Sequence, residues 1–514
     1  MVDALVRRQS LSELLSRSAA RHGERPAIIC GEVEWSYARF DAIVDELAAG
    51  LVSANIVAGD RVAILARNSH SFMAVRFAVA RIGAVLVPVN FMLNAAEVRY
   101  ILDHSGARML FLDRSTVDVG HEAKPDAIDA VFGLTDEWGE VPGELPSWES
   151  LLRPGYKRPP AADARSLAQI IYTSGTESRP KGAMLSHEAV LWQYQSCITD
   201  CEWRADTVAV HAMPLFHCAQ LDAMIGPALS VGAKNVITST PTPERLIPLF
   251  ERYRATSFFA PPTVWISLLR SPLFDAHDLS TLVRGYYGAS IMPVEVLREI
   301  RTRLPGLRLW NLYGQTEIAP VATILFPEEH EARLGSAGRA TLHVETRIVD
   351  DMMRDVAVGE IGEIVHRSPQ LLDGYWKDSE KTAEAFAGGW FHSGDLGTMD
   401  ADGYITVVDR KKDMIKTGGE NVSSREVEEI LYTHPAVSEV AVIGLPDPRW
   451  IEAVTAYIVL RSGHAASSDE LIEHCRAALA GFKVPKRVEF IDAMPRNASG
   501  KILKRDLRLV TGDA

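Results

Sequence analysis

The stretch SLAQIIYTSGTESRPKGAMLSHEAVLWQYQ, residues 166–195, places a strand-like run, a loop and a helix-like run one after another. Ser186 stands directly before the last run and is a suitable helix N-cap. Between the two runs, residues 172–182 (YTSGTESRPKG) combine hydroxyls, glycines and one lysine. A loop of this kind that leads from a strand into a helix is a setting for phosphate binding. Taken alone, the same composition fits a solvated surface loop equally well.

Two common nucleotide-binding patterns are excluded. The pattern GxxxxGK[ST] is not matched, because Pro180 stands where the second glycine belongs and Gly182 stands where the hydroxyl belongs. No two glycines of the chain are two positions apart, so GxGxxG cannot occur. The sequence therefore disfavours a P-loop nucleotidase, a dinucleotide-binding fold and a protein kinase.

The surrounding chain alternates between strand and helix patterns. Residues 61–68 (RVAILARN) predict a buried strand, residues 71–83 an apolar helix closed by Gly83, and residues 84–90 the next strand. The rhythm continues through ARMLFLD, DAVFGLT, AKNVITST and TSFFAPP. These patterns predict the α/β class, with a large N-terminal domain of helix-covered β-sheets.

The composition of the sequence changes after about residue 400. A segment rich in charge and glycine is followed by a short helix, two strands (EVAVIGL and AVTAYIVL), another helix and a final strand. This order predicts a small α+β unit. We expect a boundary near Asp409, with one domain over residues 1–409 and a second over residues 410–514.

Composition points to a small-molecule partner. The chain has 514 residues, 47% of them hydrophobic, and a formal net charge of −13, which argues against nucleic acid or an anionic membrane surface. Its five cysteines show no CxxC spacing, so neither a disulfide framework nor a zinc site is indicated. No run of about 18 apolar residues predicts a transmembrane segment. A cytoplasmic location is expected.

Four further motifs follow the opening stretch in a fixed order. They are NLYGQTE (311–317), HSGDLG (392–397), DRKKDMIKTGGENV (409–422) and PRNASGKILKRDL (495–507). Together the five resemble the adenylate-forming enzymes, the family of acyl-CoA synthetases, firefly-type luciferases and peptide-synthetase adenylation domains. The resemblance covers nearly the whole chain. It implies a mobile C-terminal domain, a distorted β-barrel in the large domain, and activation of a carboxylate by ATP.

The resemblance also implies the nucleotide contacts. The phosphates would meet Thr173, Ser174, Gly175, Thr176 and Lys181, and the rest of the nucleotide site would comprise Gly288, Ala289, Asn311, Tyr313, Gly314, Thr316, Asp395 and Arg410. Within this set Tyr313 stacks on adenine and Asp395 binds the ribose hydroxyls with Arg410 nearby. Glu317, with Thr176, would hold Mg²⁺, a hard cation that prefers oxygen ligands. Without the other motifs, Glu317 would be read as a surface ion-pair residue, Asp395 as a turn cap and Gly288 as a strand end.

Two C-terminal lysines are given separate tasks by the resemblance. Lys501 would bridge the carboxylate and the α-phosphate during adenylation, whereas Lys416, Gly418 and Gly419 would serve the reaction with CoA. The family alternates between these steps by rotating the small domain, and Lys412 stands at the hinge position. A lysine on a charged loop is otherwise simply solvated.

The sequence says less about the acyl substrate. PLFH (214–217) resembles the segment of acyl- and aryl-CoA ligases in which His217 covers the acyl site, although a lone histidine is more often structural. Asp222 lies beyond the position where amino-acid-activating relatives carry an ammonium-binding aspartate, so an uncharged acid is expected. Residues 258–269 (FFAPPTVWISLL) are apolar enough to line a tunnel or to be core.

These observations predict an acyl-CoA synthetase that uses ATP, Mg²⁺ and CoA, with a medium- or long-chain fatty acid as the first choice of substrate. An aryl-acid CoA ligase and an acyl-AMP ligase that loads a carrier protein are the alternatives. Luciferase-like oxidation and a non-catalytic acyl-nucleotide sensor are more distant ones. The expected partners are a small carboxylate, ATP and CoA, and a homodimer remains open.

The chain departs from the family pattern in two places. Glu177 and Ser178 stand where the family usually has Thr and Gly, and Ile451 stands where it usually has Gly. A triphosphate would repel Glu177 by several kcal/mol at low effective dielectric. We therefore expect Glu177 to point to solvent or toward Arg179. Ile451 belongs to the surface that is expected to face CoA.

Overall fold

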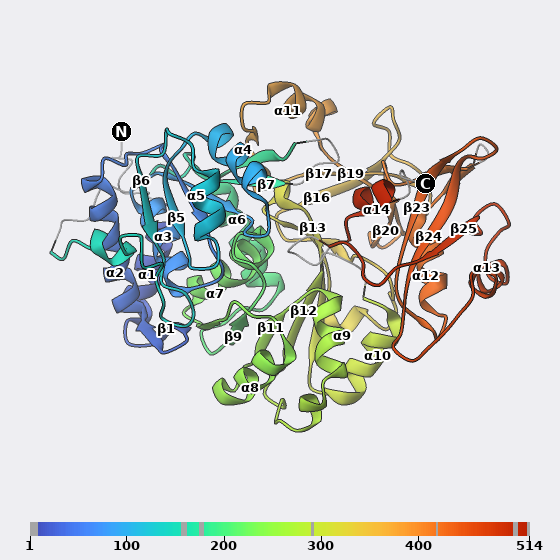
Figure 1. Cartoon of the computed structure of the whole chain (residues 1–514), viewed down its shortest axis with the longest axis horizontal. Helices are drawn as coiled ribbons and strands as arrows, with labels where there is room; N and C mark the ends of the chain where they lie inside the picture. Colours follow the sequence, from blue (N-terminus) through green and yellow to red (C-terminus); the bar gives the residue numbers. More distant parts are fainter. Residues whose placement is uncertain are drawn as a thin grey trace.

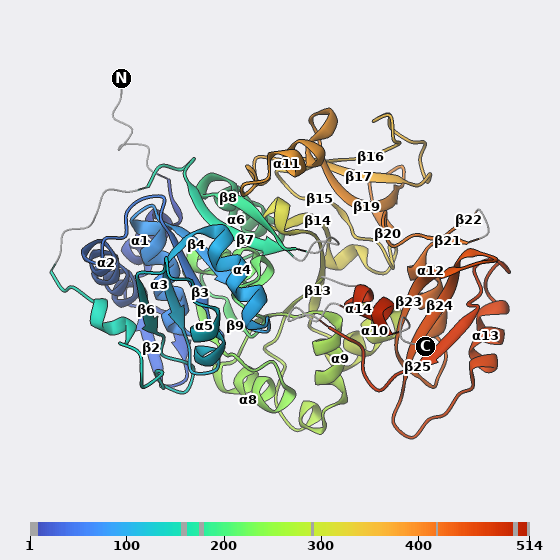
Figure 2. The same cartoon turned by 45° about the horizontal axis from the view of Figure 1, so that its top comes forward.

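The computed structural model describes residues 9–155, 162–173, 179–288, 292–417, 420–496 and 502–510. Within these ranges the chain forms four sheets (Figure 1), three in the large N-terminal part and one in the C-terminal part. The C-terminal sheet and its helices, orange to red in Figures 1 and 2, lie to one side of the rest.

A seven-stranded sheet carries the opening stretch. Its order is β18 (Gly374–Tyr375), β8 (Lys181–Ser186), β7 (Leu167–Thr173), β4 (Val85–Val89), β3 (Arg61–Leu65), β5 (Ala107–Leu112) and β6 (Ala130–Gly133). The strands predicted at residues 61–68 and 84–90 are confirmed as β3 and β4, which pair in parallel. The expected loop into a helix contains a further strand, because β8 runs antiparallel to β7 before α6 (His187–Asp200) begins.

The second sheet has nine strands. Its order is β15 (Arg339–Ala340), β14 (Val321–Leu325), β13 (Arg308–Gly314), β12 (Arg284–Gly288), β11 (Ser257–Phe259), β9 (Val208–His211), β10 (Lys234–Ile237), β1 (Pro26–Cys30) and β2 (Val33–Ser36). The five strands from β13 to β10 pair in parallel. Parallel strands need long crossover connections, which are usually α-helices, and this agrees with the alternation of strands with helical or polar segments in the sequence.

Helices cover and separate these sheets. They are α1 (Leu11–His22), α2 (Tyr37–Ser53), α3 (His70–Arg81), α4 (Ala95–Ser105), α5 (Val117–Ala123), α7 (Gly226–Val231), α8 (Pro243–Tyr253), α9 (Pro262–Arg270), α10 (Val294–Arg303) and α11 (Ser379–Ala385). All twelve residues of α3 are buried. One core cluster joins Phe72 and Phe77 of α3 to Ile28 of β1 and Val62 of β3, so this helix lies between the two sheets.

A four-stranded antiparallel sheet follows, in the order β16 (Glu345–Val349), β17 (Gly362–Arg367), β19 (Phe391–Met399) and β20 (Ile405–Arg410). An isolated bridge between Gly338 and Ile405 links it to the region of β15. These antiparallel strands form an open four-stranded sheet, and the distorted β-barrel implied by the resemblance stays a prediction.

The C-terminal unit has a five-stranded sheet formed by β22 (Glu420–Val422), β21 (Ile415–Thr417), β24 (Ile451–Leu460), β23 (Val437–Asp447) and β25 (Arg487–Phe490). Its helices are α12 (Ser424–Tyr432), α13 (Ser468–Arg476) and α14 (Lys504–Val510). The predicted order of helix, two strands, helix and strand is confirmed, and α14 follows the strand expected to be last. The predicted boundary between residues 409 and 410 lies at the end of β20.

No helix in the described parts of the chain is long and apolar enough to cross a membrane. All five cysteines are buried as free thiols, spread over both parts of the chain.

Candidate active site

The two ends of the opening loop are held together by a β-ladder. Thr173 of β7 pairs with Lys181 of β8, and Tyr172 pairs with Gly182. A Cβ on Gly182 would lie 2.7 Å from Ile170 Cγ2, so the Ile170 side chain occupies the space that a larger residue would need. Ser174, Gly175 and Thr176, together with Glu177 and Ser178, lie outside the described residues. The guanidinium of Arg179 lies 5.4 Å from the ring centre of Tyr100.

Tyr375 connects the loop lysine to the predicted metal ligand. Lys181 Nζ lies 5.4 Å from the ring centre of Tyr375, and the Tyr375 hydroxyl donates to Glu317 Oε1 at 3.0 Å. Burial and the nearby Glu317 carboxylate raise the pKa of Tyr375, so its hydroxyl keeps its proton for this bond. Tyr375 pairs with Ala183 of β8 across the short strand β18. Sequence reasoning missed Tyr375, and the aromatic pair in LDGYWKD (372–378) was the available signal.

Cys218, the residue after the segment PLFH, contacts Thr316 of the motif YGQTE. Thr316 begins the short helix η5 (Thr316–Ile318), is buried, and has its Oγ1 at 3.3 Å from the Cys218 sulfur. The preceding His217 accepts from the Ala219 amide through Nδ1 at 3.1 Å, at the start of a π-helical turn, η3 (Ala219–Ile225). Such turns occur often at functional sites. His217 is therefore the chain neighbour of Cys218, which contacts Thr316, the residue predicted to bind a phosphate.

Tyr313, Asp395 and Arg410 form one connected cluster. The Tyr313 hydroxyl donates to Asp395 Oδ2 at 2.7 Å, and Arg410 Nε lies 3.1 Å from Asp395 Oδ1. Although burial opposes its charge, Arg410 has a raised pKa because Asp395 lies beside it. The Asp395 carboxylate thus faces two strands other than its own, β13 and β20, instead of capping a turn. The three predicted nucleotide residues are brought together from positions nearly 100 residues apart.

Backbone approaches explain two of the predicted glycines. A Cβ on Gly288 would lie 2.4 Å from the Leu312 carbonyl oxygen, and a Cβ on Gly314 would lie 2.1 Å from that of Pro320. Asn311 of β13 donates through Nδ2 to the Ser336 carbonyl at 2.9 Å. Ala289 lies outside the described residues. β12 and β13 therefore end in close contact where the nucleotide is expected.

The C-terminal residues lie on both sides of the β20–β21 turn. Lys412 is exposed in that turn, and Lys416 is exposed on β21, where its amide donates to Glu452 at 2.7 Å. Gly418, Gly419 and Lys501 lie outside the described residues. Figure 2 shows β21 and β22 at the outer edge of the small unit, whereas α14 lies on the side that faces β13 in both views.

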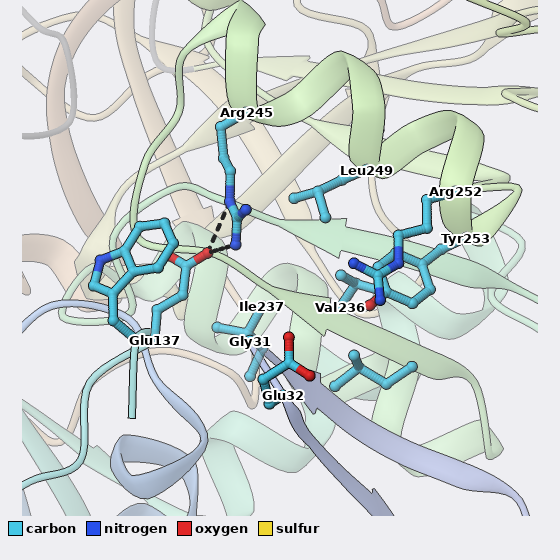
Figure 3. A pocket seen from close by; sticks show the side chains of 11 residues that line it. Gly31, Glu32, Glu137, Val236, Ile237, Arg245, Leu249, Arg252 and Tyr253 are labelled. Atoms are coloured by element: carbon cyan, nitrogen blue, oxygen red, sulfur yellow. Dashed lines mark hydrogen bonds and ion pairs between the residues drawn. The ribbon is translucent and has the colours of Figure 1, made fainter. Parts of the chain in front are cut away.

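A cavity of about 140 Å³ lies elsewhere, between β1, β10 and α8 (Figure 3). None of the predicted site residues lines it. Its buried carboxylate, Glu137, accepts from Thr238, the Ser239 amide and Arg245, so the charge of Glu137 is already paired. We assign this cavity a structural role and place the chemistry at the loop.

The chain resembles proteins of known activity along nearly its whole length. The family described as AMP-binding enzyme matches residues 15–376, and the AMP-binding enzyme C-terminal domain matches residues 426–501. A feruloyl-CoA synthase from Amycolatopsis sp is 36% identical over 504 residues, which cover 98% of this chain and 99% of the relative. The long-chain-fatty-acid–CoA ligase FadD13 of Mycobacterium tuberculosis is 34% identical over 485 residues, 93% of each chain.

A solved structure extends the likeness to the fold. The anthranilate CoA ligase AuaEII in complex with anthranoyl-AMP superposes with a TM-score of 0.89 and 26% identity, covering 98% of this chain and 97% of that one. The chain therefore belongs to the AMP-binding enzyme family and has the two-domain fold of adenylate-forming enzymes. It is an adenylate-forming CoA ligase, an acid–thiol ligase that uses ATP and CoA. The relatives act on aromatic and on fatty acids, so they leave its acyl substrate undetermined.

Proposed function

We propose that this ligase activates a compact, uncharged, hydrophobic carboxylic acid, with aromatic acids as the first candidates. A carboxylate oxygen attacks the α-phosphorus of ATP and releases pyrophosphate. The CoA sulfur then attacks the acyl carbon of the adenylate and releases AMP. Catalysis of both steps depends on positioning the reactants and on balancing phosphate charge.

The packing of residues 258–269 is the observation that indicates the size of the acyl site. Phe258 and Trp265 are each 1% exposed, and their ring centres lie 5.4 Å apart. Trp265 Nε1 also donates to the Tyr286 carbonyl at 3.2 Å. The large side chains that could have lined a tunnel are used in the core, which favours a short acyl site over one for a long chain. The aromatic substrate in the name of the 36% identical relative supports the same choice.

The state of Asp222 supports an uncharged acid. Its carboxylate is fully buried, lies 2.6 Å from Arg76, and accepts from Gln169 at 2.6 Å. A substrate ammonium would have to displace a buried guanidinium to reach it. Removing one partner from a buried ion pair costs about 3–5 kcal/mol, so Asp222 does not serve as an ammonium-binding residue.

The site residues take the following roles in this proposal. The phosphates are held by Thr173, Lys181, Thr316 and the loop residues Ser174, Gly175 and Thr176. Adenine binds at Tyr313, near Gly288, Ala289, Asn311 and Gly314. Asp395 with Arg410 binds the ribose, and the acyl group lies under His217. The connection from Lys181 through Tyr375 to Glu317 supports a common phosphate and metal region.

Mg²⁺ fits the donor chemistry of Glu317. The described residues contain no group of three or more His, Cys, Asp or Glu that could hold a metal by themselves. Mg²⁺ usually keeps several waters and binds through one or two carboxylates plus substrate phosphates. Glu317, with the Thr176 hydroxyl, supplies a donor set of that type, and the ion would neutralise charge on the triphosphate.

A panel of acids tests the substrate. Pyrophosphate release is measured with ferulic, benzoic, hexanoic and palmitic acids, each with and without CoA. We expect the highest kcat/KM for an aromatic acid and CoA-dependent thioester formation. A preference for palmitic acid would contradict the compact site and favour the fatty-acid ligase. Release of pyrophosphate without any CoA thioester would favour the carrier-loading alternative.

Substitution of the two lysines tests the alternation between steps. Lys501→Ala should lower adenylation by about 10²–10³-fold, as expected on removal of one preorganised electrostatic donor, yet still convert supplied acyl-adenylate to thioester. Lys416→Ala should do the reverse. Pyrophosphate release without CoA and thioester formation from synthetic acyl-adenylate follow the two steps separately. Equal loss of both steps in both variants would leave a single static site, in which Lys412 has no hinge role.

A further inference from the structure

Three hydrogen-bonding residues at the start of α12 hold it against β20. Ser423 Oγ donates to the Val408 carbonyl at 2.9 Å, and Arg425 donates to the Val407 carbonyl. Asp409 Oδ2 accepts from both the amide and the hydroxyl of Ser424, at 2.7 and 2.8 Å. β20 belongs to the four-stranded sheet of the large part, whereas α12 belongs to the C-terminal unit. These bonds therefore cross the expected domain boundary.

The same serine is tied to the helix that follows Lys501. Lys504, the first residue of α14, donates to Ser424 Oγ at 2.6 Å and lies 2.8 Å from Glu428 of α12. Glu428 also accepts from the Val442 amide at 2.8 Å. Burial opposes the charge on Lys504, but Glu428 and Asp409 raise its pKa, so the ammonium is retained.

These contacts continue into the nucleotide cluster. Asp409 precedes Arg410, whose guanidinium pairs with Asp395, and Asp395 accepts from Tyr313. The Arg410 amide donates to Asp409 Oδ1 at 2.7 Å, so one path of hydrogen bonds and ion pairs runs from Tyr313 to Lys504. In this arrangement α14 faces β13 (Figures 1 and 2), and Lys416 is exposed on β21, next to the edge strand β22. Because α14 follows Lys501 in the sequence, we take the side of the small unit that carries α14 as the side that serves adenylation.

We propose that Asp409, Ser424 and Lys504 form a latch whose members are positioning residues for adenylation, and that the latch opens for the CoA step. The inference rests on the two-step alternation in the proposed function. The hinge position Lys412 lies between Asp409 and Ser424 in the chain, so rotation there separates β20 from α12 and breaks both bonds to Asp409. The latch therefore stabilises one orientation and not the other.

Half-reaction kinetics of the full-length enzyme test the latch. Lys504→Met and Asp409→Asn should each slow pyrophosphate release without CoA by about tenfold, the effect of weakening one charged hydrogen bond. Thioester formation from supplied acyl-adenylate and CoA should stay unchanged or rise. The acid used is the one with the highest kcat/KM in the panel. Lys504→Arg should restore adenylation, and the KM for ATP should not change in any of these variants.

A matched control comes from another lysine that forms an ion pair with α12. Lys483 lies 2.7 Å from Glu426 of α12 but makes no contact with β20 among the interactions of the described residues. Lys483→Met should leave both half-reactions unchanged. Should Lys504→Met fail to fold, Ser424→Ala removes the shared hydroxyl with a smaller change of volume and carries the same expectation.

The outcomes separate the latch from the proposed alternation. Suppose that Lys501→Ala and Lys416→Ala affect different steps, as the alternation requires. If the Asp409 and Lys504 variants then slow both steps equally, or slow neither step, the latch is wrong and the alternation stands. When the lysine variants themselves do not separate the steps, the alternation is wrong and the latch is overturned with it. Slowing of adenylation alone, with rescue by arginine, supports the latch.

Discussion

Ile451 has a backbone conformation that a β-branched residue rarely adopts. Its φ is +70°, in the left-handed region, and its side chain is 65% exposed at the start of β24. It pairs with Thr417, next to Lys416. The Cβ of an L-residue is crowded in this region, at a cost of roughly 1–2 kcal/mol. The glycine usual in the family would remove that cost.

We expect Ile451→Gly to raise the free energy of unfolding by about 0.5–1 kcal/mol, after allowance for the greater entropy of glycine in the unfolded chain. Urea denaturation measures the change. Val358→Gly is the control, because Val358 is similarly exposed but lies outside the set of residues with positive φ. The control should be neutral or slightly less stable. A loss of stability in Ile451→Gly equal to that of the control would show that Ile451 is not strained.

Glu317 is the residue on which the metal assignment depends. Glu317→Gln keeps the size of the side chain and an acceptor for Tyr375, but removes the charge that Mg²⁺ prefers. Adenylation should fall by about 100-fold or more at limiting Mg²⁺, with the thermal midpoint nearly unchanged. Glu328→Gln, at an exposed ion pair with Arg308, is the matched control. Wild-type rates for Glu317→Gln at limiting Mg²⁺ would remove Glu317 from the site.

Four elements meet at one buried ion pair. Arg76 of α3 binds Asp222 of η3, and Gln169 of β7 and Tyr194 of α6 hydrogen-bond to both partners. β7 leads into the phosphate loop, and η3 follows His217. The ion pair therefore sets the distance between the strand that carries the loop and the helix that begins at the acyl site.

Arg76→Met should lower the free energy of unfolding by about 3–5 kcal/mol, because it leaves the Asp222 charge buried without its partner. The double variant Arg76→Met, Asp222→Leu should recover a substantial part of that loss, since both charges are then gone. Urea denaturation of the wild type and the two variants measures this. A double variant no more stable than Arg76→Met would show that the loss comes from packing and not from the unpaired charge.

Across the whole molecule, four buried histidines couple stability to pH. Burial lowers the pKa of His70, His187, His211 and His366 to about 4, well below the unfolded value of 6.5. The unfolded chain therefore binds more protons than the folded chain once the pH falls below about 6.5. Their contribution to stability is complete above that pH and is lost as the pH falls toward 4.

Between pH 6.5 and 5.5 each of these histidines should cost about 1 kcal/mol of unfolding free energy. Urea denaturation at the two pH values and constant ionic strength measures the sum. His366→Gln should show a shallower decline than the wild type, because one titrating group is absent. Equal stability at both pH values would mean that these histidines have the same pKa in the folded and unfolded states.

The sequence by itself determined the local elements, the exclusion of the common nucleotide motifs and the class of reaction. Periodicity and capping depend on neighbours in the chain, so α3 closed by Gly83 and the Ser186 cap were predictable. Short motifs also placed Tyr313, Asp395 and Arg410, and the structure joins them in one cluster.

Only the tertiary structure decided which long-range partners these residues have. The strand β8 depends on pairing with β7, Tyr375 reaches Glu317 across β18, and Asp222 is neutralised by Arg76 from another helix. The apolar residues 258–269 could equally have lined a tunnel, until packing against neighbouring helices placed Phe258 and Trp265 in the core. Such outcomes depend on which surfaces the sheets bury against each other, and residues far apart in the chain carry no local signal of that choice.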